Sequence, residues 1–200
     1  MISKNDFNKL AKKGYNRIPL MCEVLADLDT PLSTYTKICN FPYSYLFESV
    51  EGGEKWGRYS IIGLPAKKII SVTGEKVKIT ENNKLIDEYN TSDPLKEIEK
   101  IQQSYKVAQI ENMPRFSGGL VGYFGYETIR YIEPRLNKNN KEDPIGSPDI
   151  LLMVSDEVVV FDNLSGKLFI IVHADPKKND AYSNALQRLD DISGMLRDNQ

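Results

Sequence analysis

The chain has 200 residues, 40% hydrophobic and 27% charged, which gives room for one globular domain or at most two small ones. Lysine and arginine total 26 against 28 aspartate and glutamate residues, so a net charge of −2 offers no positive field for nucleic-acid phosphates. No apolar run is long enough to cross a membrane, and the N-terminus lacks a secretory core, so we expect no membrane partner and a cytoplasmic location.

The first part of the chain predicts two helices on either side of a strand. A helix is expected over about residues 3–13, with Ser3 as its cap. Residues 17–25 read as a strand in which Pro19 indicates an edge position or a strand start. A short second helix is expected to begin at Pro31, because proline suits the first turn of a helix.

Short β-rich runs separated by turn residues follow between residues 44 and 90. Their even spacing predicts an antiparallel meander. The next segment, 93–105, predicts a helix because Leu95, Ile98 and Ile101 fall on one face.

The last part of the chain predicts a hairpin and a C-terminal helix. Two apolar runs, 149–162 and 167–175, are joined by a turn, and an amphipathic helix is expected over 177–197. The polar run 137–143 reads as an exposed loop. Strands and helices are partly segregated, so we expect an α+β fold with a largely antiparallel sheet and flanking helices.

Cysteine and histidine are rare, which limits the available chemistry. Cys22, Cys39 and His173 are one residue short of a four-ligand zinc site, and one cysteine pair is too few for a disulfide framework. We expect two free thiols in a reducing compartment. His173 lies in a strand-like run beside Phe169 and Ile171, so a packed structural histidine is expected there rather than a catalytic one.

The glycine-rich segment 117–127 could be taken for a phosphate-binding loop. Its spacing matches neither a dinucleotide fingerprint nor a P-loop. We therefore expect its glycines to let a strand approach another backbone closely, with Tyr123, Phe124 and Tyr126 covering the gaps.

Residues 45–60 form the one candidate ligand corner. An apolar strand ends in Glu48 and Ser49, and Lys55 and Arg58 flank the chain's single tryptophan. Glu48 can accept hydrogen bonds from an ammonium group, and Arg58 can pair with a carboxylate. The alternative interpretation is a strand end and hairpin whose charges are solvated. The sequence shows no credible catalytic constellation.

Two segments resemble the N-terminal region of anthranilate synthase component I. They are DLDTPLSTYTKICNFPYSYLFESVEGGEKWGRYSIIGLPA, residues 27–66, and FSGGLVGYFGYETIRYIEPRL, residues 116–136. The strand-rich segment 149–175 also fits, so the resemblance covers at least residues 25–175 in the family's order.

The resemblance implies an activity and an effector. Members of this family make anthranilate from chorismate with Mg²⁺, using ammonia that a glutamine amidotransferase subunit, component II, delivers. L-tryptophan inhibits them at an allosteric pocket that uses a Leu-Leu-Glu-Ser motif. The motif reads Leu46-Phe47-Glu48-Ser49 here, so Glu48 and Ser49 are the implied tryptophan-binding residues.

The chorismate-binding half of the family follows this region in full-length members, and we expect it to be missing here. Residues 1–200 are then the regulatory region of a truncated chain, catalytically inert alone, with no catalytic residue and with the Mg²⁺ ligands elsewhere. Two alternatives remain open. One is aminodeoxychorismate synthase component I, against which the run GGEKWGRYSIIG favours the anthranilate enzyme, and the other is a free-standing amino-acid-binding module.

Overall fold

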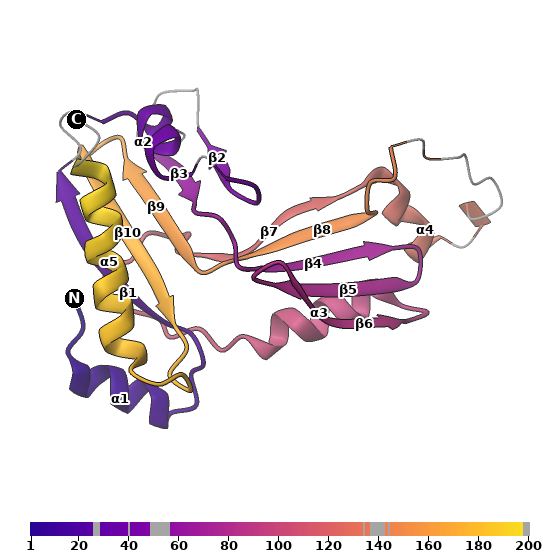
Figure 1. Ribbon diagram of the computed structural model, residues 1–200, viewed down its shortest axis with the longest axis horizontal. Coiled ribbons are helices and arrows are strands. Elements are labelled where there is room, and N and C mark those ends of the chain that lie inside the picture. The colour runs from indigo at the N-terminus through magenta and orange to yellow at the C-terminus, as the bar shows by residue number, and fades with distance from the viewer. Residues whose placement is uncertain are drawn as a thin grey trace. The chain divides into compact units, whose positions relative to one another are not determined.

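Two five-stranded sheets organise the computed structural model shown in Figure 1. Each sheet belongs to its own compact unit. The first unit comprises Met1–Ala66, Tyr105–Gly119 and Ser155–Gln200, and the second comprises Lys67–Ser104 and Leu120–Val154. The structure describes residues 1–25, 29–39, 41–48, 57–133, 135–136, 143 and 145–197.

The first sheet has the strand order β1-β10-β9-β3-β2, with every neighbouring pair antiparallel. In that order the strands are β1 (Ile18–Leu25), β10 (Lys167–Ala174), β9 (Glu157–Asp162), β3 (Tyr59–Gly63) and β2 (Tyr45–Phe47). β1 and β2 are therefore the two edges. The edge position of β1 agrees with Pro19, which cannot donate a backbone hydrogen bond to a further strand.

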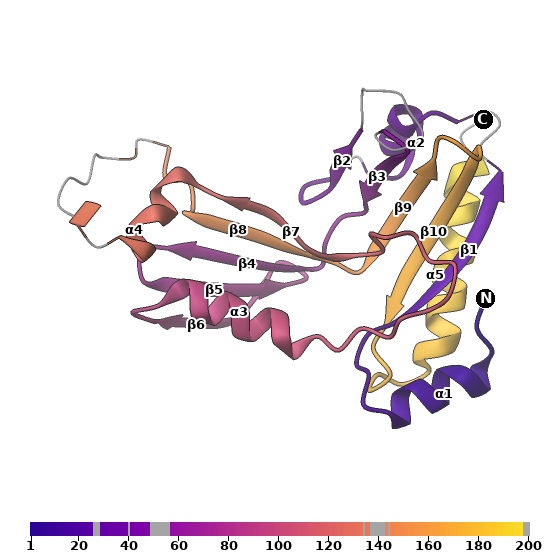
Figure 2. The ribbon, with the colours of Figure 1, turned by 180° about the vertical axis from the view of Figure 1, so that it is seen from behind.

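Three helices accompany this sheet: α1 (Lys4–Lys12), α2 (Pro31–Ile38) and α5 (Ala181–Arg197). α5 packs on β10 and β1, as Figures 1 and 2 show. Its buried residues Ala185, Leu189, Ile192 and Leu196 join the core of the first unit. Each fully buried leucine or isoleucine contributes about 1.5–3 kcal/mol, so this face fixes the helix on the sheet.

The second sheet has the order β6-β5-β4-β8-β7. Its strands are β6 (Lys84–Asn90), β5 (Lys76–Glu81), β4 (Lys68–Thr73), β8 (Ile150–Ser155) and β7 (Gly119–Phe124). This part of the chain also holds the helices α3 (Pro94–Ser104), η1 (Tyr126–Thr128) and α4 (Ile129–Ile132). The expected α+β class with largely antiparallel sheets is confirmed.

Two strand predictions differ from the structure. The expected meander over 44–90 is divided, because β2 and β3 belong to one sheet and β4 to β6 to the other. The chain passes from the first sheet to the second between Gly63, the last residue of β3, and Lys68, the first residue of β4. The apolar run 149–162 is likewise not one strand. It breaks at Asp156 into β8 and β9, and the Asp156 carboxylate binds Arg17 instead of packing in a core.

The glycine-rich segment makes the close backbone approaches that were expected. A Cβ atom on Gly122 would lie 1.9 Å from the carbonyl oxygen of Leu151, and one on Gly118 would lie 2.5 Å from that of Ser155. Gly118 also has a φ of +142°, which L side chains rarely adopt. The expectation that the aromatic residues cover the gaps is wrong for Tyr126, which is 90% exposed.

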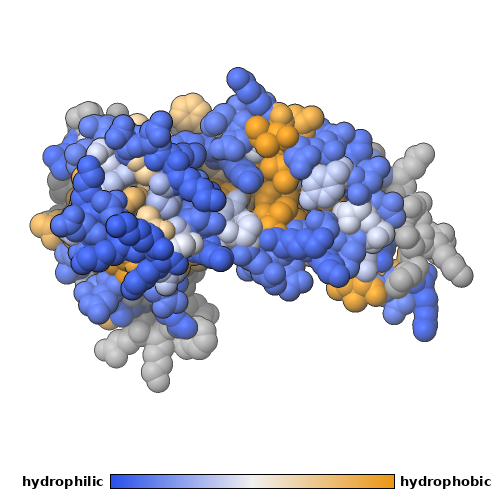
Figure 3. All heavy atoms as spheres, turned by 90° about the horizontal axis from the view of Figure 1, so that it is seen from below, coloured by the Kyte–Doolittle hydropathy of each residue, from blue (hydrophilic) through white to orange (hydrophobic). Residues whose placement is uncertain are grey.

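The face in Figure 3 is largely hydrophilic, and apolar residues gather there only in limited areas. Exposed apolar side chains occur on both edge strands of the second sheet, Leu85 and Ile86 on β6 and Phe124 on β7. Within the described ranges, no helix is both long and apolar enough to cross a membrane.

The Gly122 contact leads to a stability prediction. Gly122→Ala places a methyl group against the Leu151 carbonyl, so we expect the free energy of unfolding to fall by about 1–3 kcal/mol in urea titrations. Gly194→Ala is the matched control, because a Cβ there has open space inside α5. It should stabilise the chain by about 0.5–1 kcal/mol. Equal stability of the two variants would contradict the close approach at Gly122.

Candidate functional site

The candidate ligand corner lies at the free end of β2. β2 is a three-residue edge strand, and among the described strands its one neighbour is β3, in the register Tyr45↔Gly63 to Phe47↔Ile61. Glu48 follows directly and is exposed. Ser49 lies outside the described residues, as does Lys55, so the structure does not place either side chain.

The Tyr45 side chain fixes β2 against the rest of the first unit. Its hydroxyl lies 2.8 Å from Ser155 Oγ, and its ring occupies the space that a side chain at Gly63 would need. Burial raises the pKa of Tyr45 to about 12, so the hydroxyl is protonated at neutral pH and can donate. The Phe47 ring packs 4.9 Å from the Tyr45 ring centroid and is 53% exposed.

Arg58 does not present its guanidinium freely to a ligand. Its Nε donates to Asp162 Oδ1 at 2.9 Å and its Nη2 to Asp162 Oδ2 at 2.6 Å. The guanidinium also lies over the Tyr59 ring. The Asp162 side chain is only 4% exposed, and the Arg58 hydrogen bonds lower its pKa to about 2. The Arg58 guanidinium was expected to bind the carboxylate of a ligand, but it binds the Asp162 carboxylate with both of its donors.

Asn163, next to Asp162, holds the segment around Arg58 in place. Asn163 Nδ2 donates to Ser60 Oγ at 3.2 Å and to the Gly57 carbonyl at 3.3 Å. The Asn163 backbone N–H donates to the Arg58 carbonyl. Arg58 and Asp162 therefore act as the frame of this corner. Glu48 is the described site residue that remains exposed, and no described lysine or arginine pairs with its carboxylate.

His173 is a structural residue, as its strand context predicted. Its Nε2 lies 2.7 Å from the carbonyl oxygen of Ser117, which can only accept, so Nε2 carries the proton. Burial lowers the pKa of His173, which favours the neutral ring. The histidine thus holds the segment before β7 and has no place in the candidate corner.

The described residues contain no group of three or more His, Cys, Asp or Glu side chains that could hold a metal ion. A surface cavity of about 290 Å³ lies elsewhere in the first unit. Its lining includes Tyr15, Asn16, Lys106 and Lys177, and neither Glu48 nor Arg58 contributes to it. Glu48 therefore lies at an exposed strand end rather than in this cavity.

Residues 44–200 match the model of the family described as chorismate binding enzyme. The chain belongs to the family of chorismate-binding enzymes. The match begins at Ser44, just before β2, and so includes Glu48 and Ser49 as well as the whole second sheet.

Two similar proteins within this family share one name, anthranilate synthase component 1. The chain is 52% identical to anthranilate synthase component 1 of Pseudomonas putida over 196 residues, which is 98% of this chain and 40% of that protein. It is also 52% identical to the protein of the same name from Neisseria meningitidis serogroup C, with the same shares covered. The resemblance to anthranilate synthase component I is confirmed, and the aminodeoxychorismate alternative is not favoured.

A solved structure supports the fold independently. The crystal structure of anthranilate synthase component I from Streptococcus pneumoniae TIGR4 matches with a TM-score of 0.52 at 23% identity, covering 85% of this chain and 36% of that one. The chain spans about two fifths of the length of the curated relatives named above.

The Arg58–Asp162 pair leads to a pH prediction. The folded-state pKa of Asp162, about 2, lies below its ordinary value near 3.8, so the pair stabilises the fold above pH 4. That contribution should be lost as the pH falls from about 4 to 2. In urea titrations across this pH range, the free energy of unfolding should fall less steeply for Asp162→Asn than for the unmodified chain.

Arg58→Met and the double variant complete this experiment. The double variant should show nearly the same pH dependence as Asp162→Asn, because neither retains the carboxylate that titrates. An unchanged slope in Asp162→Asn would contradict the assignment.

Proposed function

We propose that the chain is the N-terminal regulatory part of an anthranilate synthase component I. The observation that carries this proposal is the identity of about half of all positions to proteins of that name over 98% of the chain. The full-length enzyme would convert chorismate to anthranilate. A glutamine amidotransferase subunit, component II, would deliver the ammonia, and the reaction would take place in the cytoplasm, which the two free thiols support.

The chorismate chemistry is assigned to a part of the longer protein other than residues 1–200. Mg²⁺ would supply charge stabilisation to the carboxylates of chorismate when bound. The described residues bring no carboxylate cluster together that fits such an ion, so no catalytic step is assigned to them. Their role in the proposal is to bind the effector and to hold the strand end that binds it.

L-tryptophan is the proposed effector, and Glu48 and Ser49 are the proposed contacts. Glu48 is exposed at the end of β2, where its carboxylate can accept hydrogen bonds from the ammonium group of an amino acid. A charge-assisted hydrogen bond of this kind contributes about 1.5–3 kcal/mol. Ser49, the next residue of the motif, can donate to the effector's carboxylate or accept from its ammonium group.

Ser49→Phe tests the effector contact in the full-length enzyme. The larger side chain should obstruct the pocket and raise the inhibition constant for tryptophan at least about tenfold, equivalent to about 1.4 kcal/mol. Anthranilate production without tryptophan should stay within about twofold. Inhibition is measured from anthranilate fluorescence at increasing tryptophan.

Ser92→Phe provides the matched control, because it places the same bulk at an exposed serine of the second unit. It should leave the inhibition constant unchanged. If Ser49→Phe also leaves it unchanged, the residue-by-residue assignment of the pocket is wrong.

Residues 1–200 alone are expected to make no anthranilate. The purified chain, given chorismate, ammonia and Mg²⁺, should produce no anthranilate fluorescence above a protein-free blank, because the proposed catalytic residues lie in the remainder of the enzyme. The full-length enzyme assayed in parallel is the positive control. Turnover by the 200-residue chain would overturn the regulatory assignment.

A further inference from the structure

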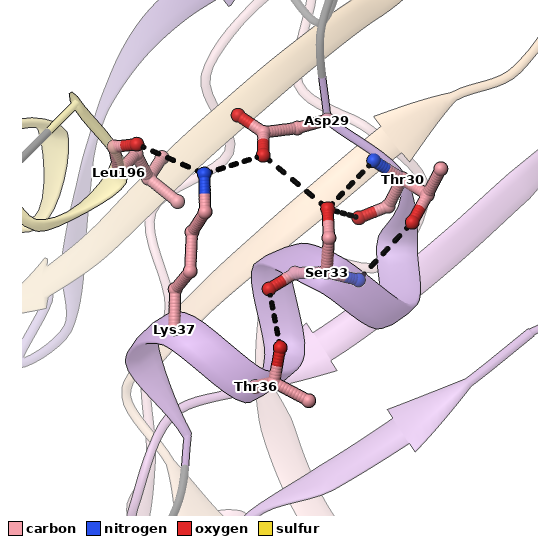
Figure 4. Close-up of polar contacts among 6 residues, drawn as sticks. All are labelled: Asp29, Thr30, Ser33, Thr36, Lys37 and Leu196. Atoms are coloured by element: carbon pink, nitrogen blue, oxygen red, sulfur yellow. Dashed lines mark hydrogen bonds and ion pairs between the residues drawn. The ribbon is translucent and has the colours of Figure 1, made fainter. Parts of the chain in front are cut away.

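A three-way contact joins two helices from opposite ends of the chain. Figure 4 shows Lys37, in the last turn of α2, donating from Nζ to Asp29 Oδ1 at 2.8 Å and to the Leu196 carbonyl oxygen at 3.3 Å. Both charged side chains are only 15% exposed. By contrast, the Lys9–Asp6 pair on α1 is 72% and 54% exposed. Water therefore screens the Lys37 contact far less.

The Leu196 carbonyl belongs to the last turn of α5. Carbonyl groups there have no partner within the helix and lie at the negative end of its dipole. An ammonium group is a favourable partner at this position, so Lys37 fastens α2 to the C-terminal end of α5. The Leu196 side chain is itself buried in the core of the first unit, which keeps the attachment point in place.

Asp29 also orders the start of α2. The Ser33 hydroxyl proton is shared between Asp29 Oδ1 at 3.3 Å and the Thr30 carbonyl oxygen at 3.1 Å, and Ser33 forms a reciprocal capping box with Thr30. The Asp29 carboxylate thus accepts hydrogen bonds from Ser33, in the first turn of α2, and from Lys37, in its last turn. Because α2 has only eight residues, these contacts at its two ends set the position of the whole helix.

A second set of hydrogen bonds connects α2 to β2. The Tyr35 hydroxyl lies 3.1 Å from Ser44 Oγ, and Ser44 Oγ donates to the Cys39 carbonyl at 2.8 Å. Ser44 directly precedes β2, a short edge strand with one neighbour, and Glu48 directly follows it. The placement of Glu48 therefore depends on α2, and through Lys37 on the end of α5.

We propose that Lys37 is a positioning residue that couples the effector corner at Glu48 and Ser49 to the C-terminal end of α5. This inference rests on the proposed function, since it concerns the response to the effector bound there. Lys37 touches neither effector nor substrate. It links α2 to the end of α5, so a shift of α2 when the effector binds at the end of β2 also shifts the Leu196 end of α5. The coupling is reciprocal, so a change at the end of α5 alters effector affinity by the same factor.

Lys37→Met in the full-length enzyme tests the proposal, because methionine keeps most of the apolar stem and removes the ammonium group. At subsaturating chorismate, the activity that remains under saturating tryptophan should rise at least about fivefold over that of the unmodified enzyme. The kcat and KM without tryptophan should stay within about twofold. Lys37→Arg, which keeps the charge, should restore most of the inhibition.

Lys9→Met is the matched control, since it removes an exposed lysine from the Asp6 ion pair on α1 and should change nothing in the inhibition curve. Asp29→Asn tests the same contact without altering Lys37 and should give an intermediate loss of inhibition. If Lys37→Met does not fold, as judged by circular dichroism, Asp29→Asn decides the question alone. Inhibition like that of the unmodified enzyme in each folded variant overturns the proposal.

The Ser49→Phe enzyme separates this failure from failure of the proposed function. If tryptophan does not inhibit the unmodified enzyme, or if Ser49→Phe responds like it, the effector site itself is wrong. If Ser49→Phe resists tryptophan while Lys37→Met is inhibited normally, the effector site stands and the coupling through Lys37 is wrong.

Discussion

Burial of the β9–β10 hairpin on both of its faces is the constraint on which the first unit depends. On one face, Val159 and Ile170 are fully buried in the core that α5 covers. On the other face, Val158, Val160 and Ile171 form a second buried cluster. β9 is therefore an interior strand that must find a partner on each side, which places β10 on one side and β3 on the other. Within the described ranges β2 pairs with β3 alone, so the position of Glu48 follows from the hydrophobic pairing of strands more than a hundred residues later.

Charged pairs at the rim of this core attach the peripheral elements. Arg58 and Asp162 tie the start of β3 to the end of β9, and Arg188 binds Glu157 to tie α5 to the start of β9. Lys37 joins α2 to α5 through a backbone carbonyl instead, that of Leu196. Partly exposed ion pairs contribute little net stability, so the effect of these pairs is to fix position rather than to supply most of the stability. Among the described residues, Glu48 stays exposed at the end of β2 while Arg58 and Asp162 pair with each other.

Glu48 and Arg58 differ in how tightly the fold holds them. Glu48 belongs to a strand end held at the edge of the sheet by few partners, and such elements can respond to a ligand at small cost. Arg58, which the residue pattern offered as a second ligand contact, is committed to Asp162 instead. Only the tertiary structure distinguishes Glu48, which stays exposed, from Arg58, which is paired, because the sequence offered both side chains equally as ligand contacts.

The sequence by itself determined four of the helices, α1, α2, α3 and α5, the strand-rich character of the segments between them, and the resemblance to the family. The Ser3 cap, the first-turn proline Pro31, the apolar spacing on α3 and two long motifs act over short range, so they can be read directly. Only the tertiary structure decided which strands share a sheet, why the run at Asp156 breaks, and which partners Lys37 and Arg58 take. Leu196 lies 159 residues from Lys37 and Asp162 lies 104 residues from Arg58, and no local pattern encodes a contact that the packing of the whole sheet creates.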